Sequence, residues 1–414
     1  FKNRLYYIDV KGMLSSLHGS AGAITALQNS VAHYYQRASS ADYLGVDPTR
    51  RSLTGTGGYV KVGRKGNAKW NFSETFTWSS PGFDLNDMGY MKETDYLMNE
   101  TEIMYRQTDI WKIFRYNAFT LSQKNMWNYG GTPFSNNASL RWQSMTMNRY
   151  EWDVKETFAW NWLDSRLLRG GPDVRFGSYF LTSAKFNTDK AKRMMFMLKY
   201  EGDHNFEGNR FNTISPSLTF RLGNHVYLSG QLDYAWNTDE MQYVATTSPL
   251  SSSSLTPYYY VMGHMDQKTY GLTLKLQVNV TPDISIQFYG APFTSIAKYD
   301  DFKLAADTKS HTFENRFQRI DPDHLTYADG VYTIGEGAGQ MPFRNPDFRF
   351  NEFRSNLVAR WEYLPGSTLY FVWEHRMSNR DNWYSSGWGS NLDRMWGLPA
   401  TNTFMIKMNY WFNL

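Results

Sequence analysis

The segment from Asn382 to Gly397 combines aromatic side chains with acids and an arginine. Its aromatic members are Trp383, Tyr384, Trp388 and Trp396, which lie near Asp381, Asp393 and Arg394. Aromatic faces stack on sugar rings, and charged side chains bond sugar hydroxyls, so these four aromatics are the candidate ligand-binding residues. The same composition is more often typical of anchoring at a membrane surface, where Trp and Tyr collect.

Other residue patterns do not indicate catalysis, a cofactor or a metal. Asp321 to Gly330 holds three aspartates but lacks the spacing and closing glutamate of an EF-hand, so a solvated acidic loop is the better interpretation. The 8 histidines show no metal-ligand spacing. A serine nucleophile elbow and a phosphate-binding loop are also missing. We therefore expect a noncatalytic protein; a barrel hydrolase is the less favoured alternative, since paired carboxylates cannot be recognised from spacing alone.

Strict alternation of apolar and polar residues defines the elements that must position these side chains. In Leu272 to Phe288, LTLKLQVNVTPDISIQF, the two apolar faces match only if Val280 opposes Ile284 and Leu276 opposes Phe288. Thr281 to Asp283 then forms a three-residue loop. This pattern predicts an antiparallel β-hairpin with one face toward lipid.

Two further turns follow the same rule. Around residues 223–225, Leu222 is expected to oppose Val226 and Phe220 to oppose Leu228. Around residues 365–367, Trp361 is expected to oppose Phe371 and Ala359 to oppose Trp373. Three hairpins with one parity indicate a continuous antiparallel sheet.

Composition agrees with a membrane barrel. Aromatic residues make up 17% of the 414 residues, yet the mean hydropathy is -0.57 and no apolar run of about 18 residues predicts a membrane helix. A β-barrel with a polar lumen reconciles these values. The absence of cysteine excludes disulfides and thiolate chemistry, and the scattered charges, with a net charge of +4, do not support nucleic-acid binding.

Alternating segments predict one transmembrane antiparallel β-barrel domain over residues 1–414, with about 16 to 18 strands of about 10 to 15 residues each. Short turns, expected on the periplasmic side, are predicted near residues 18–22, 64–67, 147–149, 188–191, 223–225, 281–283 and 365–367. Long loops, expected to be extracellular, are predicted over about 80–99, 163–177, 246–256, 300–347 and 379–402. The loop over 300–347 is expected to fold into the lumen or over its mouth.

These turns make both the first and the last strand run toward the periplasmic side. Two such neighbours would be parallel, which a closed antiparallel barrel does not allow. We therefore expect either that strands before Phe1, together with a signal peptide, lie outside this chain, or that one segment is miscounted. The last segment, FMIKMNYWFNL, is similar to the C-terminal signal strand of bacterial outer-membrane proteins.

Four longer strings carry a family resemblance: SPGFDLNDMGY (80–90), LRGGPDVR (168–175), DISIQFYGAPFTSIAKYDDF (283–302) and NPDFRFNEFRSNLVARWEYLPGSTLYFVW (345–373). They resemble an uncharacterised outer-membrane β-barrel domain family of Bacteroidota. In that family the barrel forms the C-terminal part of proteins with an N-terminal carbohydrate-binding family 9-like β-sandwich. The resemblance implies the outer membrane of a Gram-negative bacterium and a link to glycans, but supplies no catalytic residues. The resemblance implies that the sandwich and the first barrel strands of the family precede this chain.

The hairpin parity also predicts which polar residues line the lumen. The candidates are Arg221, Asp233, Lys275, Gln277, Gln287, Arg360, Glu362 and Glu374. They are interpreted as a network that fills the barrel, or as a solute path. We expect the protein to contact outer-membrane lipid and to bind an extracellular ligand, with a glycan as the leading candidate. The alternative is an accessory or structural subunit that docks other outer-membrane proteins.

Overall fold

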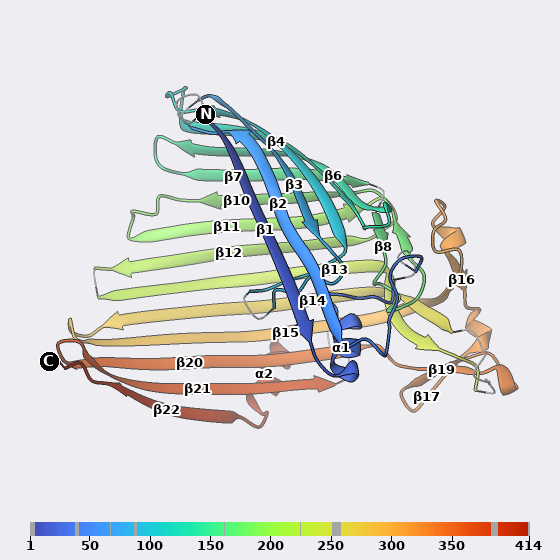
Figure 1. Ribbon diagram of the computed structural model, residues 1–414. Coiled ribbons are helices and arrows are strands. Elements are labelled where there is room, and N and C mark those ends of the chain that lie inside the picture. Colours follow the sequence, from blue (N-terminus) through green and yellow to red (C-terminus); the bar gives the residue numbers. More distant parts are fainter. Residues whose placement is uncertain are drawn as a thin grey trace.

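The computed structural model describes residues 5–37, 41–66, 68–86, 89–160, 162–223, 225–250, 258–381 and 388–412. These residues form one large antiparallel sheet of 17 strands that curls around a deep concave side (Figure 1). Strands that follow one another along the chain are neighbours in the sheet. The alternation of apolar and polar residues explains this order, because each strand needs an adjacent strand with matching faces.

The strands of the large sheet are β1 Tyr6–His18, β2 Ser52–Arg64, β3 Trp70–Ser79, β4 Tyr96–Gln107, β5 Phe114–Trp127, β6 Pro133–Thr146, β7 Glu151–Trp160, β10 Tyr179–Asn187, β11 Met194–Asn205, β12 Arg210–Leu222, β13 Val226–Thr247, β14 Tyr259–Asn279, β15 Ile284–Ala305, β16 Phe317–Arg319, β20 Phe348–Leu364, β21 Ser367–Asp381 and β22 Thr401–Asn409. β8 Trp162–Asp164 pairs with β9 Val174–Phe176. β17 Leu325–Ala328, β18 Val331–Ile334 and β19 Met341–Arg344 form a small third sheet. The helices are α1 Ala21–Gln28 and α2 Trp388–Trp396, with single 3-10 turns at Glu314–Arg316, Pro322–His324 and Gly337–Gly339.

Two of the three predicted hairpin registers are confirmed. Val278 pairs with Ile286 and Leu276 with Phe288, and Leu222 pairs with Val226. The third register is wrong by two residues, because Ala359 pairs with Phe371 rather than Trp373. The cause is a tight turn at Pro365 and Gly366, where Gly366 has φ +80°, preceded by a bulge between Glu362 and Leu364. A shift of two keeps every side chain on its predicted face.

The predicted turn at residues 18–22 is also wrong. Ser20 begins α1, accepting a hydrogen bond from the Ala23 N–H on its hydroxyl at 3.2 Å. A long connection over residues 19–51 follows before β2 starts. β1 therefore starts at the short-turn edge, where Tyr6 faces Arg64, and runs in the opposite direction to β22. The predicted conflict between the first and last strands therefore depended on this misplaced turn.

Long connections gather at one end of the sheet and short turns at the other (Figure 1). β13, β14 and β15 have 22, 21 and 22 residues, longer than predicted. At about 3.3 Å per residue such strands extend roughly 70 Å, more than twice the hydrocarbon thickness of a bilayer. Their distal halves carry the long connections.

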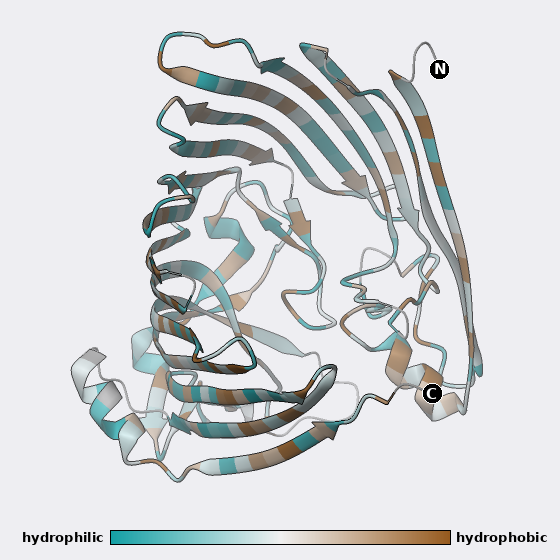
Figure 2. Ribbon diagram, turned by 90° about the vertical axis from the view of Figure 1, so that its left-hand side faces the viewer, coloured by the Kyte–Doolittle hydropathy of each residue, from teal (hydrophilic) through white to brown (hydrophobic). Residues whose placement is uncertain are grey.

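Hydrophobic and hydrophilic residues alternate along many of the strands (Figure 2), and this alternation gives the sheet two different faces. The convex face carries exposed apolar side chains on nearly every strand, such as Leu121, Leu140, Leu228 and Phe371. The concave face carries the polar residues and is partly covered by the long connections. Leu53 of β2 packs there on Tyr35 and Leu44, and Met265 and Tyr299 pack on Ile334 and Phe343 of the small sheet. The loop over 300–347 therefore lies on the concave side, at the long-connection end.

The sheet is open in the described part of the chain. β1 pairs only with β2, and β22 pairs only with β21. Side chains on both edges are exposed, with Val10 at 63% and Ile406 at 72%. The predicted all-β antiparallel architecture is confirmed, whereas barrel closure is not seen here. None of the described helices is long and apolar enough to cross a bilayer.

Candidate functional site

The predicted lumen residues share the concave face of the sheet. One row of paired residues across the sheet contains Arg221, Tyr227, Gln277 and Gln287. A second row on the same face contains Lys275 and Glu374. Lys275, Gln277 and Gln287 line a hollow of about 470 Å³. Several charges of this face bond to immediate neighbours. Asp233 accepts a hydrogen bond from Ser215 Oγ at 2.6 Å, and Arg360 Nη2 donates to Glu362 Oε2 at 2.5 Å. Such pairs are typical of a network that fills the concave side.

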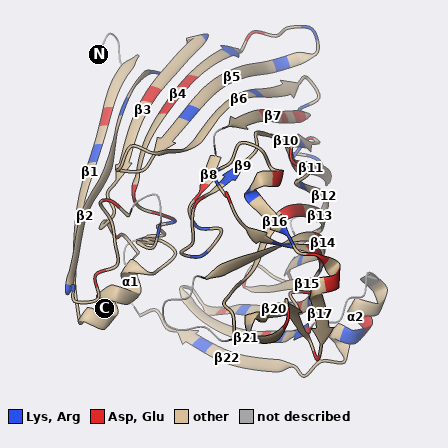
Figure 3. Cartoon of the chain, turned by 90° about the vertical axis from the view of Figure 1, so that its right-hand side faces the viewer, with Lys and Arg blue, Asp and Glu red and all other residues tan. Residues whose placement is uncertain are grey.

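The candidate aromatics do not gather into one cluster within the described residues. Trp383 and Tyr384 lie outside those residues, and Trp388 begins α2. α2 packs against β15, β20 and β21 on the convex side of the sheet (Figure 3). Trp396, at its end, is 55% exposed and contacts Phe353 edge to face, with ring centroids 4.9 Å apart. Trp396 is therefore separated from the concave face by the sheet itself.

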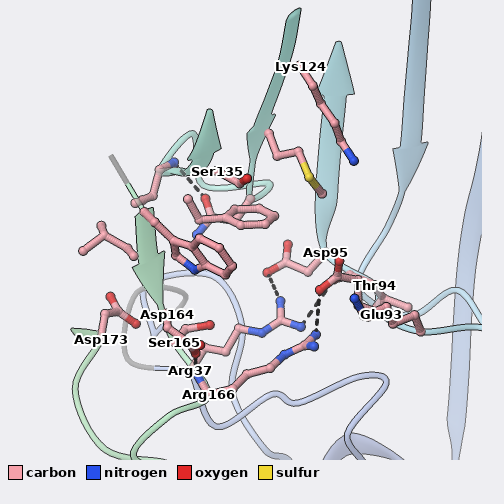
Figure 4. Close-up of a pocket in the computed structure, with 17 residues that line it drawn as sticks. Arg37, Glu93, Thr94, Asp95, Lys124, Ser135, Asp164, Ser165, Arg166 and Asp173 are labelled. Atoms are coloured by element: carbon pink, nitrogen blue, oxygen red, sulfur yellow. Dashed lines mark hydrogen bonds and ion pairs between the residues drawn. The ribbon is translucent and has the colours of Figure 1, made fainter. Parts of the chain in front are cut away.

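A pocket of about 490 Å³ lies on the concave side, at the long-connection end (Figure 4). Four parts of the chain build it: the connection after α1, the end of the connection before β4, the turn joining β5 and β6, and the segment around β8. Its polar lining is Arg37, Lys92, Glu93, Thr94, Asp95, Lys124, Asn128, Thr132, Ser135, Asp164, Ser165, Arg166 and Asp173, and its apolar lining is Met126, Phe134, Trp162 and Leu163. A volume of this size suits one or two sugar rings.

Two ion pairs hold the pocket wall together. Arg37 Nη1 donates to Asp95 Oδ2 at 2.8 Å, and the Asp95 side chain is fully buried. Asp95 also accepts hydrogen bonds from the Tyr43 hydroxyl at 2.8 Å and from the Tyr129 N–H at 3.1 Å. Burial lowers the pKa of Arg37, an effect that the charge of Asp95 opposes. The second pair joins Arg166 to Glu93 at 3.2 Å.

The opposite side of the pocket offers an aromatic ring and a buried acid. Trp162 is held by ring contacts with Tyr179 and Phe176, at centroid distances of 5.2 and 5.9 Å. The Asp173 side chain is 1% exposed, and neither carboxylate oxygen accepts a hydrogen bond from the described residues. Lys309 Nζ lies 3.2 Å from Oδ2, which gives an ion pair but leaves acceptor positions open. A buried carboxylate short of donors is the kind of group that a hydroxyl-bearing ligand can satisfy.

This pocket was not predicted from the sequence. Asp173 falls in LRGGPDVR, a string noticed only for its family resemblance, and Trp162 precedes a predicted loop. Trp162 and Asp95 are 67 positions apart, and residues that come together only in the folded chain have no spacing pattern. The local sequence offers only one indication of the pocket, namely an aspartate that lies between the apolar residues Pro172 and Val174.

The chain matches one family over residues 19–414, which is nearly its full length. It is a DUF5916 domain. The family is described only as a domain of unknown function. No curated protein matches this DUF5916 chain. Among solved structures, it is similar to the siderophore receptor PirA from Acinetobacter baumannii, with 9% identity, a TM-score of 0.39, and coverage of 98% of this chain and 68% of the receptor. A likeness at that score carries no argument about function.

Proposed function

We propose that this DUF5916 domain is an outer-membrane β-barrel protein of a Gram-negative bacterium, noncatalytic, that binds an extracellular glycan on its concave side. The apolar convex face supports contact with lipid, and the opposite placement of short turns and long connections supports extracellular loops. Bacteroidota origin and an upstream carbohydrate-binding domain remain implications of the sequence resemblance.

One observation carries the ligand proposal. Trp162 and Asp173 line the same pocket, and neither carboxylate oxygen of Asp173 accepts a hydrogen bond from the described residues. Aromatic faces bind the apolar faces of sugar rings, while carboxylates accept hydrogen bonds from sugar hydroxyls. The surrounding residues Thr94, Ser135 and Ser165 add hydroxyl groups without adding charge. No covalent chemistry is needed for this role.

Glycan binding is tested with the full chain in detergent. Wild type, Trp162→Ala and Asp173→Asn are run in native gels that contain each of a panel of neutral and acidic polysaccharides. We expect at least one polysaccharide to retard wild type, and both variants to lose about tenfold in affinity, the equivalent of about 1.4 kcal/mol. Trp396→Ala, on the convex side, is the matched control. If the two pocket variants are retarded as strongly as wild type, this pocket does not bind glycans.

Barrel closure is part of the proposal, because β1 and β22 run in opposite directions and each has a free edge. Antiparallel pairing of these edges would close the sheet. Val10→Cys is combined in turn with Phe404→Cys, Ile406→Cys and Met408→Cys, and oxidation is followed in outer-membrane fractions. We expect one combination to form an intramolecular disulfide. If none reacts, while a Val10→Cys and Val60→Cys pair on paired strands does, the edges do not meet.

A second candidate role, as an accessory subunit that docks another outer-membrane protein, is favoured by a polar group on the convex face. Glu74 lies midway along β3 between Phe72 and Phe76 and accepts hydrogen bonds from Asn99 and, at 2.6 Å, from the Thr101 hydroxyl. A carboxylate facing hydrocarbon is unfavourable, so a protein neighbour suits this part of the wall better than lipid. Native mass spectrometry should show a stoichiometric protein partner that Glu74→Leu releases. A partner-free wild type contradicts this role.

A further inference from the structure

We infer that the pocket around Trp162 binds an anionic sugar residue, with its acidic group held by Lys92 and Lys124. This inference rests on the proposed glycan-binding function and narrows its ligand class. It rests on the charged residues that line the pocket and have no partner of opposite charge among the described residues.

Most lining charges are already matched by partners. Asp95 pairs with Arg37, Glu93 pairs with Arg166, and Asp173 pairs with Lys309. Asp164 uses one carboxylate oxygen to accept the N–H groups of Arg166 and Leu167, at 2.7 and 3.0 Å, as a local turn cap.

Lys92 and Lys124 are the lining cations left over. Neither has a carboxylate within ion-pair distance in the described residues. Glu100 is the register partner of Lys124 on β4, yet these two side chains do not form an ion pair. The pocket therefore offers two ammonium groups to whatever occupies it, together with the acceptor positions that Asp164 and Asp173 leave open.

The charges are also separated in space. Figure 4 shows Lys124 reaching down from β5 on the side of Thr94 and Asp95, whereas Asp164 and Asp173 lie on the other side of the pocket. A sugar ring placed between these sides would meet acceptors for its hydroxyls on one side and the Lys124 ammonium group on the other. A carboxylate or sulfate on the ring complements the ammonium side.

The test compares two anionic probes with the neutral ester of one of them. Binding of trigalacturonate, of its neutral methyl ester and of a sulfated galactose trisaccharide is measured by calorimetry with the full chain in detergent. We expect wild type to bind one or both anionic probes about tenfold more tightly than the ester, and added salt to reduce the difference.

Variants then assign the effect to the two lysines. Lys92→Met and Lys124→Met should each lower the affinity for the anionic probes toward the affinity for the ester. Lys69→Met, in the turn between β2 and β3 at the opposite end of the sheet, changes net charge equally and should have no effect.

The outcomes separate this inference from the proposed function. Equal affinity for anionic and neutral probes, with both lost in Trp162→Ala, overturns the acidic-sugar inference and leaves glycan binding standing. A preference that survives in both lysine variants also overturns it. Absence of binding to all three probes overturns it too, and the polysaccharide panel with Trp162→Ala then decides the proposed function separately.

Discussion

Replacing Arg37 with Met is expected to release the connection between β1 and β2 from the pocket wall. Arg37 is 6% exposed and donates hydrogen bonds to Asp95 at 2.8 Å, to the His33 carbonyl at 3.1 Å and to the Thr94 carbonyl at 3.3 Å. Removing one member of a buried ion pair costs about 3–5 kcal/mol. Asp95 keeps its bonds from Tyr43 and Tyr129, so we expect the lower value, about 3 kcal/mol.

Hydrogen exchange measures this loss directly. The Thr94 N–H bonds to the Ala32 carbonyl at 3.0 Å and so joins the two connections, while the Tyr35 N–H bonds to the Gln28 carbonyl at 2.9 Å. A cost of about 3 kcal/mol corresponds to exchange that is about 100-fold faster at these amides. Lys69→Met, which breaks an ion pair between side chains 59% and 73% exposed, is the control and should change nothing. An increase below about threefold at Thr94 in Arg37→Met would refute the reasoning.

Three further predictions concern the connections that cover the concave side. Burial raises the pKa of Asp347, which accepts the Tyr299 N–H at 2.7 Å, so its contribution to stability is present at low pH and lost as pH rises through the raised pKa. Asp347→Asn should therefore raise the melting temperature at about pH 8 and not at about pH 3; no gain at the higher pH contradicts this. A Cβ on Gly55 would lie 2.1 Å from the Phe83 nitrogen, so Gly55→Ala should lift residues 80–86 from β2 at a cost of about 1–3 kcal/mol and speed proteolysis there. Gly12→Ala, with nothing within 4 Å, should not change the cleavage rate. Arg316 is 1% exposed and donates hydrogen bonds to Glu207 at 2.8 and 2.7 Å. Arg316→Met should therefore loosen residues 306–320 and raise single-channel conductance in planar bilayers. Arg319→Met, at a side chain that is 76% exposed, is the control and should leave the conductance unchanged. Equal conductance of the two variants would show that this connection does not obstruct the concave side.

The strands could be predicted because their physics is local. Val278 opposite Ile286 follows from parity alone, since a slip by one residue would turn every apolar side chain of the hairpin to the polar face. The third hairpin shows the limit of the rule. A slip by two residues keeps all faces correct, so Ala359 opposite Phe371 or Trp373 could not be distinguished by alternation. The turn at Pro365 and Gly366 decides between them.

The connections could not be predicted, because their structure depends on contacts between residues that are distant in the sequence. A short turn was predicted near residues 18–22, but serine also caps helices, and AGAITALQ after Ser20 is a helix-compatible run. The pocket was further out of reach, because Asp173 and Lys309 are 136 positions apart. The aromatic residues of the segment 382–397 were predicted to bind a ligand because they are dense in the sequence. Trp396, however, packs on Phe353, on the opposite side of the sheet from Trp162.

The meeting of several long connections around one pocket has a consequence for the order of folding. Its contacts join residues far apart in the chain, as Arg37 and Asp95 or Asp173 and Lys309 are, whereas neighbouring strands pair across short turns. Closing a large loop costs more chain entropy than closing a hairpin, so contacts of the first kind form later. The sheet can therefore assemble before the pocket exists. Binding competence would be the last property that this domain acquires.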